Sequence, residues 1–134
     1  MGPSRILVVE DNPLNRRLAV DVLRAVGYEV AEAEGAPQAR VSLASSLPDL
    51  IVLDVSLPGT DGITLLGQLR ADLRTRAIPI VATTALAMTT DRERILRAGF
   101  DAYLAKPFSP RVLRQVVGDL LQGRANPTGA PHGG

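Results

Sequence analysis

Two hydrophobic patterns alternate along the chain. Continuous apolar runs of strand length occur at residues 6–9 and 50–53, and unbroken apolarity is typical of strands covered on both faces. Between such runs, apolar residues recur every three or four positions, as on one face of a helix. Alternating strands and helices favour right-handed crossovers, and therefore a parallel sheet with helices on both faces.

The pattern predicts five strands and five helices. We expect strands at residues 6–9, 28–33, 50–53, 78–83 and 102–105, with the second nearer an edge and the fourth beginning around Pro79. The first helix has an apolar face that recurs every four residues, at Leu14, Leu18, Val22 and Val26. The later helices are expected at 37–46, after Asp61, at 90–98 and from Pro110. The third has the apolar face Ile63, Leu66 and Leu69, and the last buries Val112, Leu113, Val116, Val117, Leu120 and Leu121.

Residues that favour helix ends support these limits. Asn12 can cap the first helix, Pro13 suits its first turn and Gly27 suits the left-handed position after it. The other expected end residues are Asp61 before the third helix, the capping box from Thr90 to Glu93, Gly99, and Ser109 with Pro110.

The composition limits the classes of function. With 134 residues, 46% of them hydrophobic, we expect one domain over residues 1–122 and a disordered Gly/Pro-rich tail over 123–134. The absence of cysteine excludes a zinc–thiolate site, a thiol nucleophile and a disulfide scaffold. No apolar run approaches the roughly 18 residues of a membrane span and no signal-peptide pattern is present, so we expect a cytoplasmic protein without a membrane partner. A formal net charge of +1 and only four aromatic residues argue against direct nucleic-acid binding.

Polar residues follow the predicted strands at their carboxyl ends, where open parallel sheets bind ligands. Glu10 and Asp11 follow the first strand, Asp54 ends the third, and Lys106 follows the fifth. If the first and third strands are neighbours, the three carboxylates converge, and such a cluster repels itself unless a cation neutralises it. Carboxylate oxygens with no histidine or thiol nearby favour Mg²⁺.

Each of these residues also has an ordinary structural explanation. An aspartate at a strand end is most often a turn or cap residue, and Lys106 could be a solvated lysine. Thr84 could be a β-branched strand residue and Tyr103 a buried aromatic. The gathering of several complementary polar residues at one sheet edge favours a functional site over these separate explanations.

Four stretches carry a resemblance to a known family. They are residues 6–12 (ILVVEDN), 48–62 (PDLIVLDVSLPGTDG), 78–85 (IPIVATTA) and 99–108 (GFDAYLAKPF). In them the sequence resembles the receiver domain of two-component response regulators, either of the stand-alone chemotaxis and cell-cycle kind or attached to a hybrid histidine kinase. The resemblance implies an α/β, flavodoxin-like (βα)5 fold, which is a three-layer sandwich around a parallel five-stranded sheet of order 2-1-3-4-5.

By this resemblance, Asp54 accepts a phosphoryl group. Asp11, Asp54 and the backbone carbonyl of Ser56 would bind Mg²⁺ directly, and Glu10 would act through a metal-bound water. Glu10 stands where many members have aspartate, which changes outer-shell contacts without removing the metal.

The resemblance also implies roles at the fourth and fifth strands. Lys106 and the Thr84 hydroxyl would contact phosphoryl oxygens, supported by the backbone N–H of Ala85. Thr84 and Tyr103 would form the switch, and the bond between Lys106 and Pro107 is usually cis in this family. Two departures are Thr60, where methionine is common, and Thr83, where a larger apolar residue is common. The second could move the switch assignment to Thr83, but alternation along the strand and the following Ala85 favour Thr84.

These features predict a phosphorylation-operated signalling switch rather than a metabolic enzyme. The expected donor is a histidine kinase or a histidine phosphotransfer protein, and the expected downstream protein would bind the fourth helix, fifth strand and fifth helix. We expect a monomer or weak dimer, and no output domain after the last helix. The chain could be a stand-alone regulator or a receiver from a longer kinase.

Three other functions are weighed against this one. A nucleotide-binding enzyme needs a glycine-rich first turn, whereas residues 10–13 carry two acids that would repel phosphates. A haloacid-type phosphatase would have a second acid two residues after Asp54, where this chain has Ser56. The remaining alternative is a receiver-like adaptor that works without phosphorylation.

Overall fold

The protein is described by a computed structural model over residues 2–56, 62–85 and 89–123, with the side chains of residues 89–92 excluded. The strands are β1 (Arg5–Val9), β2 (Glu29–Ala33), β3 (Leu50–Asp54), β4 (Ile80–Thr84) and β5 (Ala102–Ala105). The helices are α1 (Pro13–Val26), α2 (Ala36–Ser45), α3 (Gly62–Ala71), α4 (Thr89–Ala98) and α5 (Pro110–Leu121).

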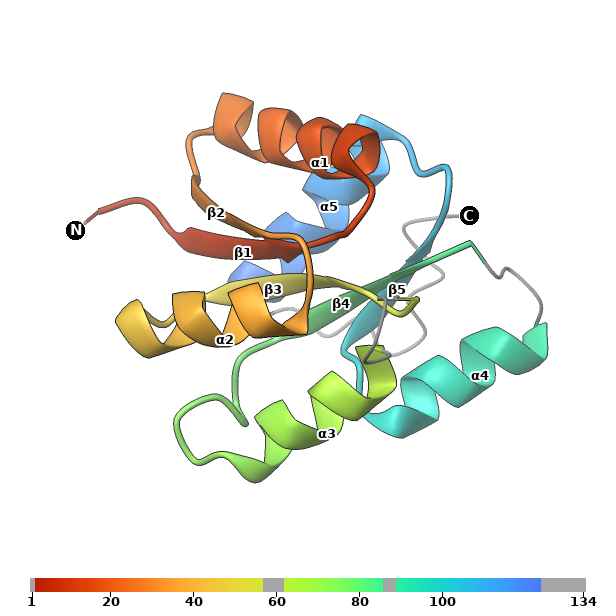
Figure 1. Ribbon diagram of the computed structural model, residues 1–134. Coiled ribbons are helices and arrows are strands. Elements are labelled where there is room, and N and C mark those ends of the chain that lie inside the picture. Colours follow the sequence, from red (N-terminus) through yellow and green to blue (C-terminus); the bar gives the residue numbers. More distant parts are fainter. Residues whose placement is uncertain (1, 57–61, 86–88, 124–134) are drawn as a thin grey trace.

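The five strands form one parallel sheet of order β2-β1-β3-β4-β5 (Figure 1). This order confirms the predicted flavodoxin-like topology, with β2 at an edge. The register pairs Val9 with Leu53, and Asp54 with Thr83, so β1, β3 and β4 end at nearly the same level.

Two apolar layers hold the helices against the sheet. Figure 1 shows α1 and α5 on one face and α2, α3 and α4 on the other. Successive residues of β3 alternate between the layers, with Val52 packing toward α1 and α5, and Leu53 toward α2 and α3. Because both faces are covered, β1 is buried from Ile6 to Val9 and β3 is buried along its whole length, and this explains their continuous apolar sequence.

The predicted apolar face of α1 is wrong. Leu14 is 80% exposed, Leu18 42% and Val26 49%, while Val22 is only partly buried. The buried residues of this helix are Ala19, Val20 and Leu23. At 100° per residue, positions four apart drift around the helix, so the four large residues do not form one face toward the sheet. The helix packs through Ala19, Val20 and Leu23 instead, and Leu14, Leu18 and Val26 remain on its exposed side.

Most predicted helix ends are confirmed. Asn12 Oδ1 accepts hydrogen bonds from the backbone N–H groups of Leu14 and Asn15, and Gly27 has a φ of 111°. Ser109 Oγ accepts from the N–H of Val112 at the start of α5.

A few boundaries differ from the prediction. β4 begins at Ile80 rather than near Pro79, because the chain before it still forms a turn in which the Ile78 N–H donates to the Thr75 carbonyl. The strand ends at Thr84, one residue later than predicted. α4 begins at Thr89, one residue before the predicted cap Thr90. The predicted cap Asp61 and residues 124–134 of the predicted tail lie outside the described residues. In the described ranges, no helix has both the length and the apolarity needed to span a membrane.

Candidate functional site

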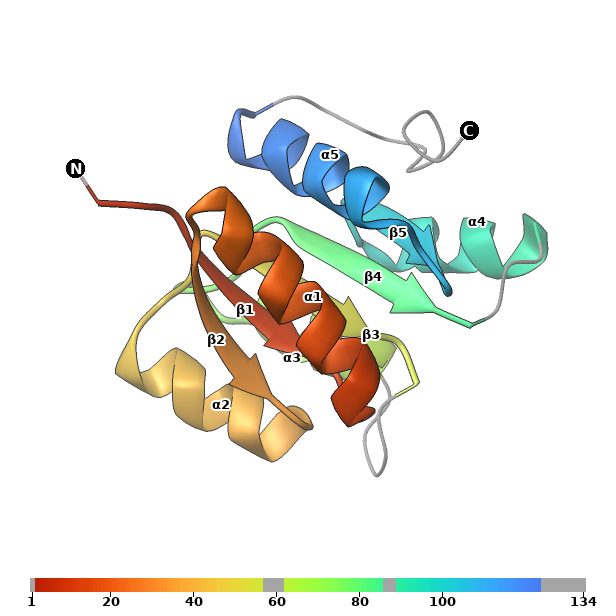
Figure 2. The same ribbon diagram turned by 90° about the horizontal axis from the view of Figure 1, so that it is seen from above.

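The strands of the sheet run in one direction, as their arrowheads show (Figure 2), and the predicted site residues follow the carboxyl ends of these strands. Glu10 and Asp11 follow β1, Asp54 is the last residue of β3, and Lys106 follows β5. The Lys106 N–H donates to the Thr84 carbonyl at 2.7 Å, which continues the pairing of β4 with β5 into the site.

Three carboxylates lie together, as predicted. Glu10, Asp11 and Asp54 each offer an oxygen, and these oxygens lie within 4.8 Å of one another. Glu10 is 4% exposed and Asp54 is 2% exposed, whereas Asp11 is exposed. The cluster is therefore buried on one side and open to water on the other.

Lys106 partly neutralises this cluster. Its Nζ lies 2.6 Å from Glu10 Oε1 and 3.2 Å from Asp54 Oδ2. Burial opposes the charge of Lys106, but the hydrogen bond to Glu10 and the charge of Asp54 outweigh it and raise the pKa of the ammonium group. Burial raises the pKa of Glu10, and the hydrogen bonds from Lys106 and the Asn12 N–H only partly offset this effect.

The donor set fits a small divalent cation. Three carboxylates face one lysine, so negative charge remains, and every candidate ligand is a hard oxygen. The exposed Asp11 leaves room for the water ligands that Mg²⁺ normally keeps.

Backbone groups fix the two buried carboxylates. The Asn12 N–H donates to Glu10 Oε2 at 3.0 Å, and the Ser56 N–H donates to Asp54 Oδ1 at 2.9 Å. Both are bonds to a residue two positions earlier, so they follow from the turns that leave β1 and β3.

Gly62 allows α3 to begin directly beside Asp54. Its N–H donates to the Val55 carbonyl at 2.7 Å. A Cβ at this position would lie 2.6 Å from the Asp54 carbonyl oxygen and 2.7 Å from the Val55 Cα. Apart from its place in a matching stretch, nothing in the sequence pattern predicted this close contact at Gly62.

Thr84 and Tyr103 lie toward the same face of the sheet. Ala82 pairs with Tyr103, and both pack in the layer of α2, α3 and α4. Alternation along β4 then places Thr84 on that face and Thr83 on the opposite one. Thr84 is fully buried and Tyr103 is partly buried, an arrangement that favours Thr84 over Thr83 as the residue adjoining Tyr103.

The other predicted site residues lie at the same edge. Ser56 and Ala85 are both exposed, just after β3 and β4, and their expected metal and phosphoryl contacts stay predictions. The peptide bond between Lys106 and Pro107 is cis, as expected.

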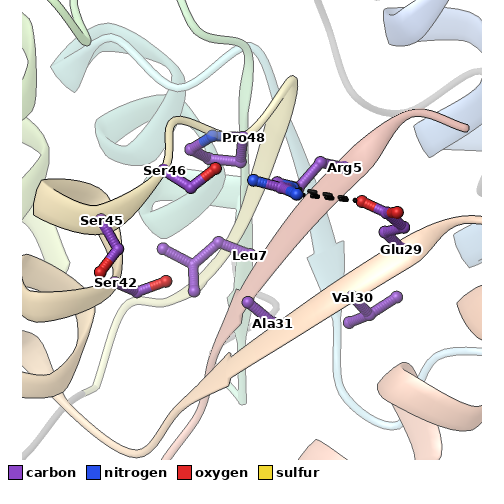
Figure 3. Close-up of a pocket in the computed structure, with 9 residues that line it drawn as sticks. All are labelled: Arg5, Leu7, Glu29, Val30, Ala31, Ser42, Ser45, Ser46 and Pro48. Carbon is purple, nitrogen blue, oxygen red and sulfur yellow. Dashed lines mark hydrogen bonds and ion pairs between the residues drawn. The ribbon is translucent and has the colours of Figure 1, made fainter. Parts of the chain in front are cut away.

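A hollow of about 270 Å³ lies at the opposite end of the sheet (Figure 3). It is formed at the start of β1 and β2 and the end of α2, with Ser42 and Ser46 at one side. Arg5 and Glu29, which also line it, form an ion pair of 3.1 Å. Because β1 and β2 run away from this end, the hollow is separate from the carboxylate cluster.

Comparisons with known proteins agree with this arrangement. A sequence model of the response regulator receiver domain matches residues 6–118. The polar-differentiation response regulator DivK of Brucella anthropi is 38% identical over 115 residues, which cover 85% of this chain and 94% of that protein.

Solved structures give the same similarity. The signal receiver domain of a signal transduction histidine kinase from Syntrophus aciditrophicus has 33% identity and a TM-score of 0.82, covering 90% of this chain and 91% of that one. The receiver domain of a sensor histidine kinase from Pseudomonas aeruginosa has 39% identity and a TM-score of 0.76, covering 87% and 99%. That second structure holds a magnesium ion in its active-site cleft.

Proposed function

This chain belongs to the response regulator receiver domain family, and from that premise we propose that it is a signalling switch operated by phosphorylation of Asp54. The observation that carries the proposal is the setting of Asp54, which is 2% exposed, joins two other carboxylates and has Lys106 Nζ 3.2 Å from Oδ2. Burying a carboxylate beside two others costs free energy, and such an arrangement is typical of a functional site.

The proposed reaction is phosphoryl transfer from a phosphohistidine. A carboxylate oxygen of Asp54 attacks phosphorus, the P–N bond breaks, and its electron pair remains on the imidazole, so an acyl phosphate forms. Lys106 offsets charge that builds on the phosphoryl oxygens, and it is already within reach of Asp54. The donor would be a histidine kinase or a histidine phosphotransfer protein.

Mg²⁺ is the proposed cofactor. Glu10, Asp11 and Asp54, with the Ser56 carbonyl, are the residues that would hold it, Glu10 through a metal-bound water. When bound, the ion supplies positive charge to the reacting phosphoryl group. Lys106 contributes further positive charge, through its ion pairs with Glu10 and Asp54.

The proposed output passes through Thr84 and Tyr103. The hydroxyl of Thr84 and the N–H of Ala85 would contact the new phosphoryl oxygens, and Tyr103 would then fill space that Thr84 leaves. Both side chains lie toward the α4 side of the sheet, which supports the α4 and β5 part of a proposed target surface formed by α4, β5 and α5. In this proposal the chain is a monomer or weak dimer and a signalling module rather than a metabolic enzyme.

Intact mass spectrometry tests the function. The wild type, incubated with Mg²⁺ and acetyl phosphate, should gain the mass of one phosphoryl group, and Asp54→Asn should gain none. Chelation of Mg²⁺ should abolish the adduct on the wild type. A wild type that stays unmodified with both small donors and kinases would favour the adaptor that works without phosphorylation.

A further inference from the structure

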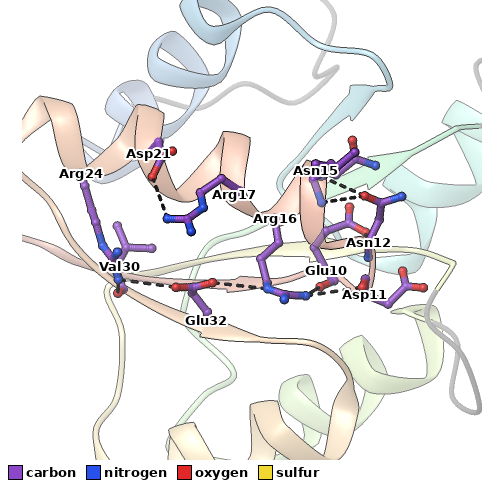
Figure 4. A network of polar contacts seen from close by, with 11 residues as sticks. Glu10, Asp11, Asn12, Asn15, Arg16, Arg17, Asp21, Arg24, Val30 and Glu32 are labelled. Atoms are coloured by element: carbon purple, nitrogen blue, oxygen red, sulfur yellow. Dashed lines mark hydrogen bonds and ion pairs between the residues drawn. The ribbon is translucent and has the colours of Figure 1, made fainter.

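Arg16 connects the first helix to the backbone of the acid pair (Figure 4). Its Nη1 donates to the Glu10 carbonyl at 2.8 Å and lies 3.4 Å from the Asp11 carbonyl. Its Nε lies 3.3 Å from Glu32 Oε1 on β2. One guanidinium therefore holds the loop between β1 and α1 against the edge strand.

The position of Arg16 in α1 is unusual for a charged residue. It precedes Ala19, Val20 and Leu23 at the spacing i, i+3, i+4 and i+7, which is the face that this helix buries. Its side chain is only 20% exposed. The first turn of the buried face thus carries a guanidinium, and that guanidinium points under the loop rather than into solvent.

The contacts of Arg16 matter most for Asp11. The Glu10 side chain is already fixed by Lys106 and by the Asn12 N–H. Asp11 is exposed, so its carboxylate depends on the backbone of a loop of three residues for its direction. Arg16 holds the carbonyls on both sides of the Asp11 N–H and Cα, and so limits how that backbone can turn.

Glu32 orients the guanidinium from the other side. Arg24 also approaches Glu32, at 3.7 Å, and donates to the Val30 carbonyl at 3.0 Å. Two arginines of α1, Arg16 and Arg24, therefore pair with Glu32 and limit the movement of its carboxylate.

We propose that Arg16 is a positioning residue that holds Asp11 where it can bind the divalent cation of the proposed site. The inference deepens the proposed function and rests on it. A planar guanidinium suits the task because it can donate to two carbonyls and a carboxylate at once, whereas an ammonium group has no such fork.

Charge gives this proposal an unusually sharp test. Removing a positive charge near the acid cluster should, by electrostatics alone, make the cluster bind a cation more tightly. Losing the position of Asp11 should make binding weaker. The two effects have opposite signs, so Arg16→Gln separates them.

The experiment titrates Mg²⁺ into 15N-labelled protein and follows amide shifts at Glu10, Asp11 and Asp54. For Arg16→Gln we expect the dissociation constant to rise about tenfold, the lower end of what outer-shell substitutions cost a metal site. The dissociation constant of Arg16→Lys for Mg²⁺ should lie between those of Arg16→Gln and the wild type.

The matched control is Arg17→Gln. It removes the same charge one residue away, from a side chain that is 74% exposed and approaches Asp21 rather than the loop. Its Mg²⁺ affinity should be unchanged or slightly higher. Equal or tighter binding by Arg16→Gln would overturn the proposal.

A metal-free measurement keeps the two proposals distinguishable. In the absence of Mg²⁺, the backbone order parameter of Asp11 should fall in Arg16→Gln and stay at its wild-type value in Arg17→Gln. A wild type without any Mg²⁺ response would contradict the proposed function, and the order parameter would still decide whether Arg16 holds Asp11. An unchanged order parameter would overturn the positioning role.

Discussion

Gly62→Ala adds one methyl group where α3 meets the backbone at the end of β3, the strand that carries Asp54. The new Cβ would lie 2.6 Å from the Asp54 carbonyl oxygen, 2.7 Å from the Val55 Cα and 3.2 Å from the Asp54 carbonyl carbon. Favourable contacts between heavy atoms lie at about 3.5–4.0 Å, so the two segments must separate by roughly 1 Å. All three neighbours are backbone atoms, and none can rotate away.

The expected cost follows from two opposing effects. Overpacking of a close contact costs about 1–3 kcal/mol, while replacing glycine by alanine in a helix returns roughly 0.5–1 kcal/mol. We therefore expect Gly62→Ala to lose up to about 2.5 kcal/mol of unfolding free energy. A shift of roughly 1 Å at Asp54 should also slow phosphorylation by up to about 10²-fold.

Urea denaturation and the rate of phosphorylation by acetyl phosphate measure the two effects. Gly67→Ala is the matched control, because it lies in the same helix and its added Cβ would meet nothing within 4 Å. It should gain about 0.5–1 kcal/mol and keep the wild-type rate. If Gly62→Ala matched this control in both measurements, the close approach of α3 to Asp54 would not constrain the site.

Three further predictions test other parts of the account. Added Mg²⁺ should stabilise the wild type by roughly 1.4 kcal/mol when free Mg²⁺ is about tenfold above its dissociation constant, and Asp11→Ala should lose most of this gain in thermal melts. Thr84→Ala should still accept the phosphoryl group but lose a charge-assisted hydrogen bond of about 1.5–3 kcal/mol. The effect of phosphorylation on the equilibrium between the two conformations should therefore fall about tenfold. Amide NMR with and without beryllofluoride, read over residues 89–115, would show equal responses in both proteins if Thr84 were not the coupling residue. In urea denaturation, Leu23→Ala should lower the free energy of unfolding by about 2–5 kcal/mol, and Leu14→Ala should change it by no more than about 0.5 kcal/mol. Equal losses in the two variants would contradict the buried face described here for α1.

The sequence was sufficient for the features that follow from strand direction. Buried parallel strands have continuous apolar sequences, so β1 and β3 were recognisable, and both must end at the same edge of the sheet. The convergence of Glu10, Asp11 and Asp54 follows from that geometry once the strands are neighbours.

Contacts that depend on how closely two segments approach each other could not be predicted from the hydrophobic and polar pattern. The buried face of α1 uses Ala19 and a half-buried Arg16, whereas a count of large apolar residues favours Leu14 and Leu18. The contact at Gly62 joins two backbones, and no side-chain periodicity encodes it. The sequence pattern gave no indication of a role for Arg16, because its contacts with the acid pair are made to backbone carbonyls.

Chemical mapping of the phosphoryl group tests the central claim most directly. Borohydride reduces an aspartyl phosphate to homoserine with release of phosphate, and trypsin then yields a peptide of residues 41–70, bounded by Arg40 and Arg70. This peptide contains Asp49, Asp54 and Asp61, so fragmentation distinguishes the three possible acceptors. We predict homoserine at position 54 alone, formed only when both Mg²⁺ and a phosphoryl donor are present. Homoserine at position 49 or 61, or an unmodified peptide from protein that carries the phosphoryl mass, would contradict it.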